Sequence, residues 1–189
     1  METNRNLHMA VYAALFSALI AAGAYLAIPI GPVPIVLQNL FVMLAGLMLG
    51  SGWGLACVCI YLLAGALGLP VFAGGAGGIG RFFGPTGGYL IGFLPAVFLV
   101  GTIAERSENR VVRDVMAMII GSVMVYALGV PWLKLMTGMS WGKAVSVGML
   151  PFLPGDALKI AAAVPIAKAL RPILAGNGMG IPAHGPHRS

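Results

Sequence analysis

The chain has 189 residues, of which 59% are apolar and only 8% are charged, and its formal net charge is +6. Soluble domains carry roughly 25% charged residues, so this chain has too few charges to cover a water-facing surface. Its positive charge does not indicate nucleic-acid binding, because the basic residues lie in short segments between long apolar blocks. The composition predicts an integral membrane protein with the lipid bilayer as its solvent.

Apolar blocks follow one another along the chain, each close to the roughly 17–25 residues of a membrane-spanning helix. They cover residues 9–28, 35–50, 53–70, 88–104, 115–133 and 151–170. The first exceeds the roughly 7–15 residues of a signal-peptide core, so we expect an uncleaved span. Only Gly50-Ser51-Gly52 separates the second block from the third, which predicts a tight helical hairpin. The expected fold class is all-α, an integral membrane bundle of six transmembrane helices.

The basic residues predict the orientation of this bundle. With both termini inside, the cytoplasmic basic residues are Arg5, Arg106, Arg110, Arg113, Lys168, Arg171 and Arg188. Those outside are Arg81, Lys134 and Lys143. This bias follows the positive-inside rule and favours the N-in, C-in arrangement. We therefore expect a cytoplasmic segment over residues 1–8, a transmembrane domain over 9–172, and a disordered cytoplasmic tail over 173–189, which is rich in Gly and Pro.

Alanines recur at every fourth position along the first block, which places them on one face of a helix. They are Ala10, Ala14, Ala18 and Ala22. A stripe of small residues lets another helix backbone approach closely. Two interpretations stay open: packing inside the bundle, or a docking face for another membrane subunit.

The segment between the third and fourth blocks is too rich in glycine for a stable helix. Such a segment permits close approach of the backbone to a ligand, or a lid that opens and closes. Its candidate ligand-binding residues are Gly74, Gly75, Arg81, Gly87, Gly88 and Tyr89. Arg81 either marks the membrane boundary or guides an anion toward the site. The segment has no preceding strand and no GKS or GKT sequence, which excludes a P-loop.

Asp156 and Lys159 stand three residues apart at the start of the last block, so they share one helix face. A charge at the centre of a membrane helix costs about 2.5–3.5 kcal/mol, which indicates a polar partner or an aqueous pocket. The pair predicts a ligand site, with Lys159 donating to a carbonyl or carboxylate and Asp156 accepting from N–H groups. The alternatives are a helix N-cap for Asp156 and, for Lys159, snorkelling or an ion pair with Asp156 alone. Gln38, early in the second block, is a further candidate ligand contact, or a bond between helices.

Chemistry of other kinds is poorly supported by the sequence. Cys57 and Cys59 lie in an apolar block as packing residues, and His184 and His187 lie in the tail. We find no metal-ligand cluster and no nucleophile–base pair, so we expect neither an enzyme nor a cofactor. A purely structural membrane protein would leave the cost of Asp156 and Lys159 unexplained.

Three motifs together resemble the BioY family, the biotin-specific substrate-binding (S) components of energy-coupling factor (ECF) transporters. They are GPVPIVLQN over Gly31–Asn39, GPTGGYLIGF over Gly84–Phe93 and LPGDALK over Leu153–Lys159. The similarity covers about residues 8–172. A different vitamin S component, or a solitary biotin transporter, is the alternative.

The resemblance implies a six-helix bundle in the cytoplasmic membrane that binds biotin from the outside. Asp156 and Lys159 would contact its polar groups, and biotin would be a transported ligand rather than a cofactor. The implied partners are a transmembrane coupling protein and two ATPase subunits, with the alanine-rich face of the first helix docking on the coupling protein. The implied transport step is a bundle that topples in the membrane to release substrate inside.

Overall fold

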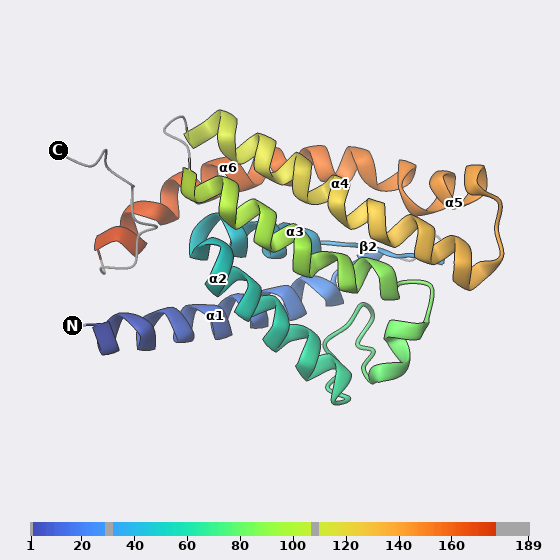
Figure 1. Ribbon diagram of the computed structural model, residues 1–189, viewed down its shortest axis with the longest axis horizontal. Coiled ribbons are helices and arrows are strands. Elements are labelled where there is room, and N and C mark those ends of the chain that lie inside the picture. Colours follow the sequence, from blue (N-terminus) through green and yellow to red (C-terminus); the bar gives the residue numbers. More distant parts are fainter. Residues whose placement is uncertain (1, 29–31, 107–109, 177–189) are drawn as a thin grey trace.

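The computed structural model describes residues 2–28, 32–106 and 110–176. The helices are α1 (Glu2–Tyr25), α2 (Gln38–Ala66), α3 (Gly87–Arg106), α4 (Arg110–Thr137), α5 (Trp141–Gly148) and α6 (Leu153–Gly176), with 3-10 turns η1 (Ile79–Phe83) and η2 (Leu150–Phe152). Two short strands, β1 (Ala27–Ile28) and β2 (Ile35–Val36), pair antiparallel. Figure 1 shows α1 along one side of the bundle and α4 with α6 along the other, with α2 and α3 between them. The predicted all-α class is confirmed.

Within the described residues, five helical segments are long and apolar enough to cross a membrane. They are Arg5–Tyr25, Gln38–Ala66, Gly87–Glu105, Val111–Thr137 and Trp141–Pro172. The expected multispan membrane protein is confirmed, whereas the count of six is not, because α2 contains the second and third predicted spans in one element. The last segment differs from its prediction as well, since it begins with the short helix α5.

Gly50 interrupts α2 at the position where the sequence predicts a hairpin. Its backbone lies at φ 79° and ψ −173°, outside the helical region. A Cβ atom at Gly54 would lie 3.3 Å from the Cα of Gly46, although residues eight apart in one straight helix are about 12 Å apart. The second arm begins at Ser51, whose backbone N–H donates to Glu105 Oε1 on α3 at 2.7 Å. The two arms of α2 therefore fold back on each other at Gly50.

The alanine stripe of α1 faces away from the bundle. Ala10, Ala14, Ala18 and Ala22 are all exposed. The opposite face of α1 is buried against α2, and Ser17 on that face donates to the Cys57 carbonyl oxygen at 2.7 Å. Packing within this chain is therefore not the role of the stripe.

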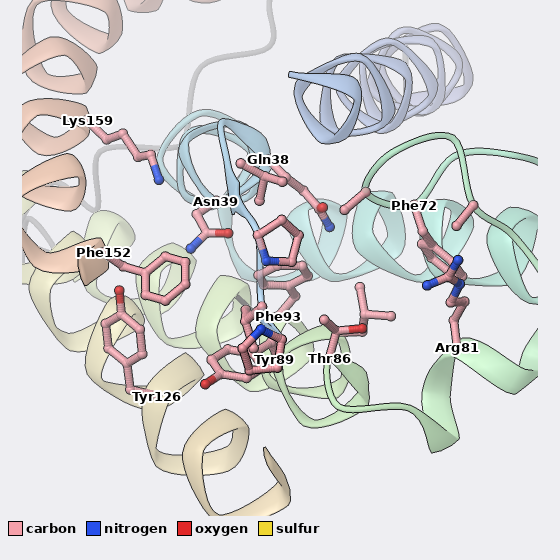
Figure 2. A pocket seen from close by; sticks show the side chains of 17 residues that line it. Gln38, Asn39, Phe72, Arg81, Thr86, Tyr89, Phe93, Tyr126, Phe152 and Lys159 are labelled. Carbon is pink, nitrogen blue, oxygen red and sulfur yellow. The ribbon is translucent and has the colours of Figure 1, made fainter. Parts of the chain in front are cut away.

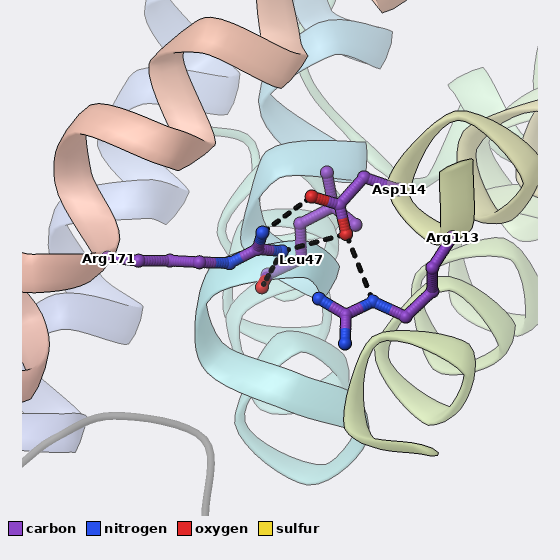
Figure 3. Close-up of polar contacts among 4 residues, drawn as sticks. All are labelled: Leu47, Arg113, Asp114 and Arg171. Carbon is purple, nitrogen blue, oxygen red and sulfur yellow. Dashed lines mark hydrogen bonds and ion pairs between the residues drawn. The ribbon is translucent and has the colours of Figure 1, made fainter. Parts of the chain in front are cut away.

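A buried ion cluster joins α4, α6 and the first arm of α2 (Figure 3). Asp114, only 1% exposed, accepts two bonds from the Arg171 guanidinium, at 2.5 and 2.9 Å, and one from Arg113 Nε at 3.2 Å. Arg171 Nη2 also lies 3.5 Å from the carbonyl oxygen of Leu47. Because buried charges are stable only when they are paired, the cluster fixes the C-terminal half of α6 against the bundle. The same helix carries Lys159 on its N-terminal half.

The predicted tail begins as helix rather than as coil, since α6 continues to Gly176. The rest of that tail, residues 177–189 with His184, His187 and Arg188, lies outside the described residues. The predicted N-terminal segment, residues 1–8, is helical from Glu2 onward.

Candidate ligand-binding pocket

A pocket opens between the start of α2, the glycine-rich segment, α3, α4 and α6 (Figure 2). Its volume is about 140 Å³, an order of magnitude above the roughly 10–15 Å³ that one water needs. The polar side chains that line it are Gln38, Asn39, Arg81, Thr86, Tyr126 and Lys159. Aromatic walls come from Phe72, Tyr89, Phe93 and Phe152. The pocket therefore suits a small ligand with both an apolar body and hydrogen-bonding groups.

Asp156 and Lys159 form a buried ion pair on the first turns of α6. Lys159 Nζ lies 3.2 Å from Asp156 Oδ1, and the Tyr126 hydroxyl from α4 donates to Asp156 Oδ2. The two residues are 6% and 8% exposed, which excludes snorkelling for Lys159. Asp156 is not an N-cap, because α6 begins three residues earlier and its carboxylate faces Lys159 and Tyr126.

The two residues of the ion pair differ in whether they face the pocket. Lys159 and Tyr126 line the pocket, whereas Asp156, which is bonded to both, does not. The carboxylate therefore holds the ammonium group and the hydroxyl in place and balances the buried positive charge. The spacing predicted the Asp156–Lys159 contact, but Tyr126 comes from a different span and carried no local signal. The cost of placing charged groups in a membrane helix, which indicated a polar partner or an aqueous pocket, is the one clue that the sequence offered.

Gln38 begins α2 at the edge of the pocket. Its side chain is 2% exposed, and its Nε2 has no hydrogen-bond partner among the described residues. Leaving a buried donor unsatisfied costs about 1–3 kcal/mol, so this amide needs a partner, which is either the neighbouring Tyr61 hydroxyl, also buried without one, or a ligand oxygen. Asn39, the next residue, also lines the pocket but was not among the predicted site residues. Two amides thus stand beside each other at the N-terminus of one helix.

The glycine-rich segment contributes its side chains to the pocket rather than its glycines. Phe72, Ala73 and Ala76 line the cavity, whereas Gly74 and Gly75 do not. These two glycines have φ of 72° and 73°, a left-handed conformation that other residues adopt at a cost. They make the turn that returns the chain from Phe72 to Ala76, whose backbones are bridged. Their observed role is to shape this turn, and their contact with a ligand stays a prediction.

The Phe72 ring anchors this segment. It packs edge-on against Tyr61 and Phe82, with ring centroids 5.6 and 5.7 Å away. It also fills the space above Gly65, where a Cβ atom would collide with it. Edge-to-face aromatic packing stabilises such contacts, so the Phe72 ring holds this segment against α2 and η1 at the pocket.

Of the three residues predicted as ligand contacts at the start of α3, one lines the pocket and two do not. Tyr89 lines the pocket, and its hydroxyl donates to the Gly148 carbonyl oxygen at 2.8 Å. Gly87 and Gly88 do not line it; a Cβ atom at either would collide with the Phe82 carbonyl oxygen or with Trp132. They allow α3 to pack closely, while Thr86 just before them faces the cavity.

Arg81 lies in η1 at the exposed mouth of the pocket. Figure 2 shows it at the opposite end from Lys159, so positive groups stand at both ends of the cavity. Within the part of the chain that the structure describes, no group of three or more His, Cys, Asp or Glu side chains could hold a metal ion. The groups that line the pocket offer hydrogen bonds, charge and aromatic contact.

The fold and this pocket define a multispan membrane protein with a small pocket inside its helical bundle. A family model described as the BioY family matches residues 1–176. The chain belongs to the BioY family.

Relatives from distant organisms resemble the chain over most of their length. A probable biotin transporter BioY from Pyrococcus horikoshii is 45% identical over 158 residues, which are 84% of this chain and 93% of the relative. The biotin transporter BioY of Thermotoga maritima is 42% identical over 161 residues, covering 85% and 94%. The crystal structure of the S-component for biotin from an ECF-type ABC transporter superposes with a TM-score of 0.85 at 33% identity, covering 91% of this chain and 95% of that one.

Proposed function

We propose that this chain is the biotin-binding subunit of a vitamin uptake transporter, which captures biotin at the outer face of the cytoplasmic membrane and delivers it inward. The observation that carries the proposal is the pocket itself, with a buried ammonium group at Lys159 and a buried amide at Gln38. Relatives described as biotin transporters and the biotin S-component support the ligand. Membership of this family makes the chain a transport protein rather than an enzyme.

The chemistry of biotin matches the pocket group by group. One of its two fused rings is a cyclic urea with two N–H donors and one carbonyl acceptor. The other is a saturated ring that contains a thioether sulfur. Its side chain ends in a carboxylate. In the proposed pose the urea lies at the α6 end of the pocket. There Lys159 donates to the urea carbonyl oxygen, and the side-chain oxygen of Asn39 accepts from the urea N–H groups. The aromatic walls contact the rings, and Arg81 attracts the carboxylate at the mouth, as charge-assisted bonds are the stronger ones.

The proposed topology has six spans with both termini in the cytoplasm. The reversal at Gly50 supports it, because the two arms of α2 then cross the membrane in opposite directions. The distribution of basic residues supports the orientation. In this orientation the ion cluster at Asp114 lies toward the cytoplasm and Arg81 lies toward the outside.

Energy for transport is proposed to come from an ECF module of a transmembrane coupling protein and two ATPase subunits. The exposed stripe Ala10, Ala14, Ala18 and Ala22 supports a docking role, because small side chains permit close helix contact in lipid. Its position on α1 leaves the pocket, which α1 does not line, free to hold the ligand during docking.

Equilibrium binding of labelled biotin to the detergent-purified chain tests the proposal. Thiamine and riboflavin serve as control ligands of similar size and different polar groups. We expect saturable binding of biotin that neither control displaces. Binding of either control vitamin in preference to biotin would assign the pocket to a different vitamin and overturn the proposal.

A further inference from the structure

A second cavity lies between α4 and the α5–α6 segment, on the other side of Tyr126 and Asp156 from the ligand pocket. Its volume is about 710 Å³. Its walls are almost entirely apolar and include Val123, Ala127, Val130, Val145, Ala157 and Ile160. Ala127 and Ala157 are exposed on membrane-spanning helices, so this groove opens to the hydrocarbon of the bilayer.

The groove runs along the seam between α4 and the α5–α6 segment. Tyr126 and Asp156 both line it, and the hydroxyl of one donates to the carboxylate of the other between α4 and α6. This pair of bonded side chains forms the floor of the groove. A hydrocarbon chain of a lipid is the occupant that matches an apolar seam open to the bilayer.

One end of the groove carries the chemistry of a lipid headgroup site. Trp141 lines that end, and Lys134 Nζ lies 5.1 Å from the centre of its ring. Lys143, two residues after Trp141, is exposed. Along α4 the groove extends from Ile119 to Pro131, about 18 Å at 1.5 Å per residue, close to the roughly 15 Å depth of one leaflet of hydrocarbon. A tryptophan with lysines at one end of an apolar slot matches the membrane interface.

We propose that this groove binds one acyl chain of an anionic phospholipid, with its phosphate held by Lys134 and Lys143. The bound chain covers the outer side of the Tyr126–Asp156 hydrogen bond. It thereby keeps water away from the back wall of the ligand pocket, where exclusion of water strengthens the ion pair with Lys159. The groove is thus a lipid site that supports the pocket from behind.

Native mass spectrometry of the whole purified chain, mixed with phosphatidylglycerol or phosphatidylcholine, tests the site. We expect one retained phosphatidylglycerol per chain. Ala127→Trp fills the groove and is expected to abolish this retention. Met116→Trp is the matched control, because Met116 is also exposed on α4 but does not line the groove. Equal retention in both variants would overturn the proposal, as would loss in both at unchanged thermal stability.

The headgroup is tested separately. Replacing Lys134 and Lys143 by glutamine is expected to reduce the preference for phosphatidylglycerol over phosphatidylcholine by about fivefold per lysine, since each basic residue near an anionic surface contributes about 1 kcal/mol. Retention of both lipids should persist, because the acyl slot is intact. An unchanged preference would contradict the headgroup assignment. Neither readout depends on biotin, so the lipid site and the proposed transport function fail independently.

Discussion

Replacing Asp156 by asparagine is expected to weaken biotin binding at least tenfold, although Asp156 does not itself line the ligand pocket. Its carboxylate accepts from Lys159 Nζ at 3.2 Å and from the Tyr126 hydroxyl. The amide keeps the shape but removes the negative charge, which leaves the ammonium group of Lys159 buried without compensation. Lys159 then no longer presents a fixed donor to the ligand.

The magnitude follows from the bond that is lost. A hydrogen bond to a charged group contributes about 1.5–3 kcal/mol, and each 1.4 kcal/mol is a factor of ten in affinity. Lys159→Ala should therefore raise the Kd about 10- to 150-fold. Asp156→Asn should fall in the same range, because it acts through the same ammonium group. If Asp156 acts only through Lys159, the losses of binding free energy from the two substitutions cannot add in the double variant.

Equilibrium binding of labelled biotin to four proteins decides the matter: the unchanged chain, each single variant, and the double variant Asp156→Asn/Lys159→Ala. We expect the Kd of the double variant to lie within a factor of about three of the Kd of Lys159→Ala. Such non-additivity corresponds to a large coupling energy between the two residues. Lys168→Ala is the control, since Lys168 lies exposed on the same helix, and it should bind as the unchanged chain does. Strictly additive losses, or unchanged affinity in both single variants, would refute the role assigned to this pair.

Three further perturbations probe the fold and the partner surface. Asp114→Ala leaves the charges of Arg113 and Arg171 without their shared carboxylate and should lower the free energy of unfolding by about 3–5 kcal/mol. The loss is measured as a lower Tm in detergent, and an unchanged Tm would contradict the role of the cluster. Ala14→Trp on the exposed stripe should leave biotin binding intact and block uptake by cells; a loss of binding would show that the stripe supports the bundle. Gly50→Ala places a side chain at a positive φ and against the Glu105 carboxylate, which should cost about 1–3 kcal/mol, whereas Gly52→Ala, with open space around it, should be neutral in the same thermal unfolding assay.

The sequence predicted the features that depend on local spacing. Long apolar blocks predicted membrane helices, and the short glycine interruption predicted the reversal at Gly50. The three-residue spacing of Asp156 and Lys159 placed them on one helix face, where the structure shows them bonded. Gln38 and Tyr89 were also found in the pocket. Each of these inferences needs only the geometry of one helix or one turn.

The features that the sequence did not predict depend on contacts between distant segments. Tyr126 meets Asp156 across 30 positions of sequence, and no periodicity within one span specifies that contact. The sequence predicted that four glycines allow a ligand to approach the backbone, namely Gly74, Gly75, Gly87 and Gly88. In the structure the first two form a turn, and the last two allow close packing of α3. Glycine has no side chain to distinguish these roles, so only the surroundings decide between them.

The short elements were missed for a related reason. The helix α5 has eight residues and the strands β1 and β2 have two each, too few for a hydrophobic period to be recognised. They nevertheless bring Val33 and Phe152 to the pocket wall, one from the segment between the strands and the other from the turn after α5. A pocket assembled from such segments appears only when the chain is folded.

A crystal structure of the chain with biotin bound would test the central claim most directly. The account predicts ligand density between Lys159 and Arg81, with the Lys159 ammonium group at hydrogen-bond distance from the urea carbonyl oxygen and the Gln38 amide bonded to a ligand acceptor. Biotin bound elsewhere on the protein, with Lys159 still facing only Asp156, would contradict it.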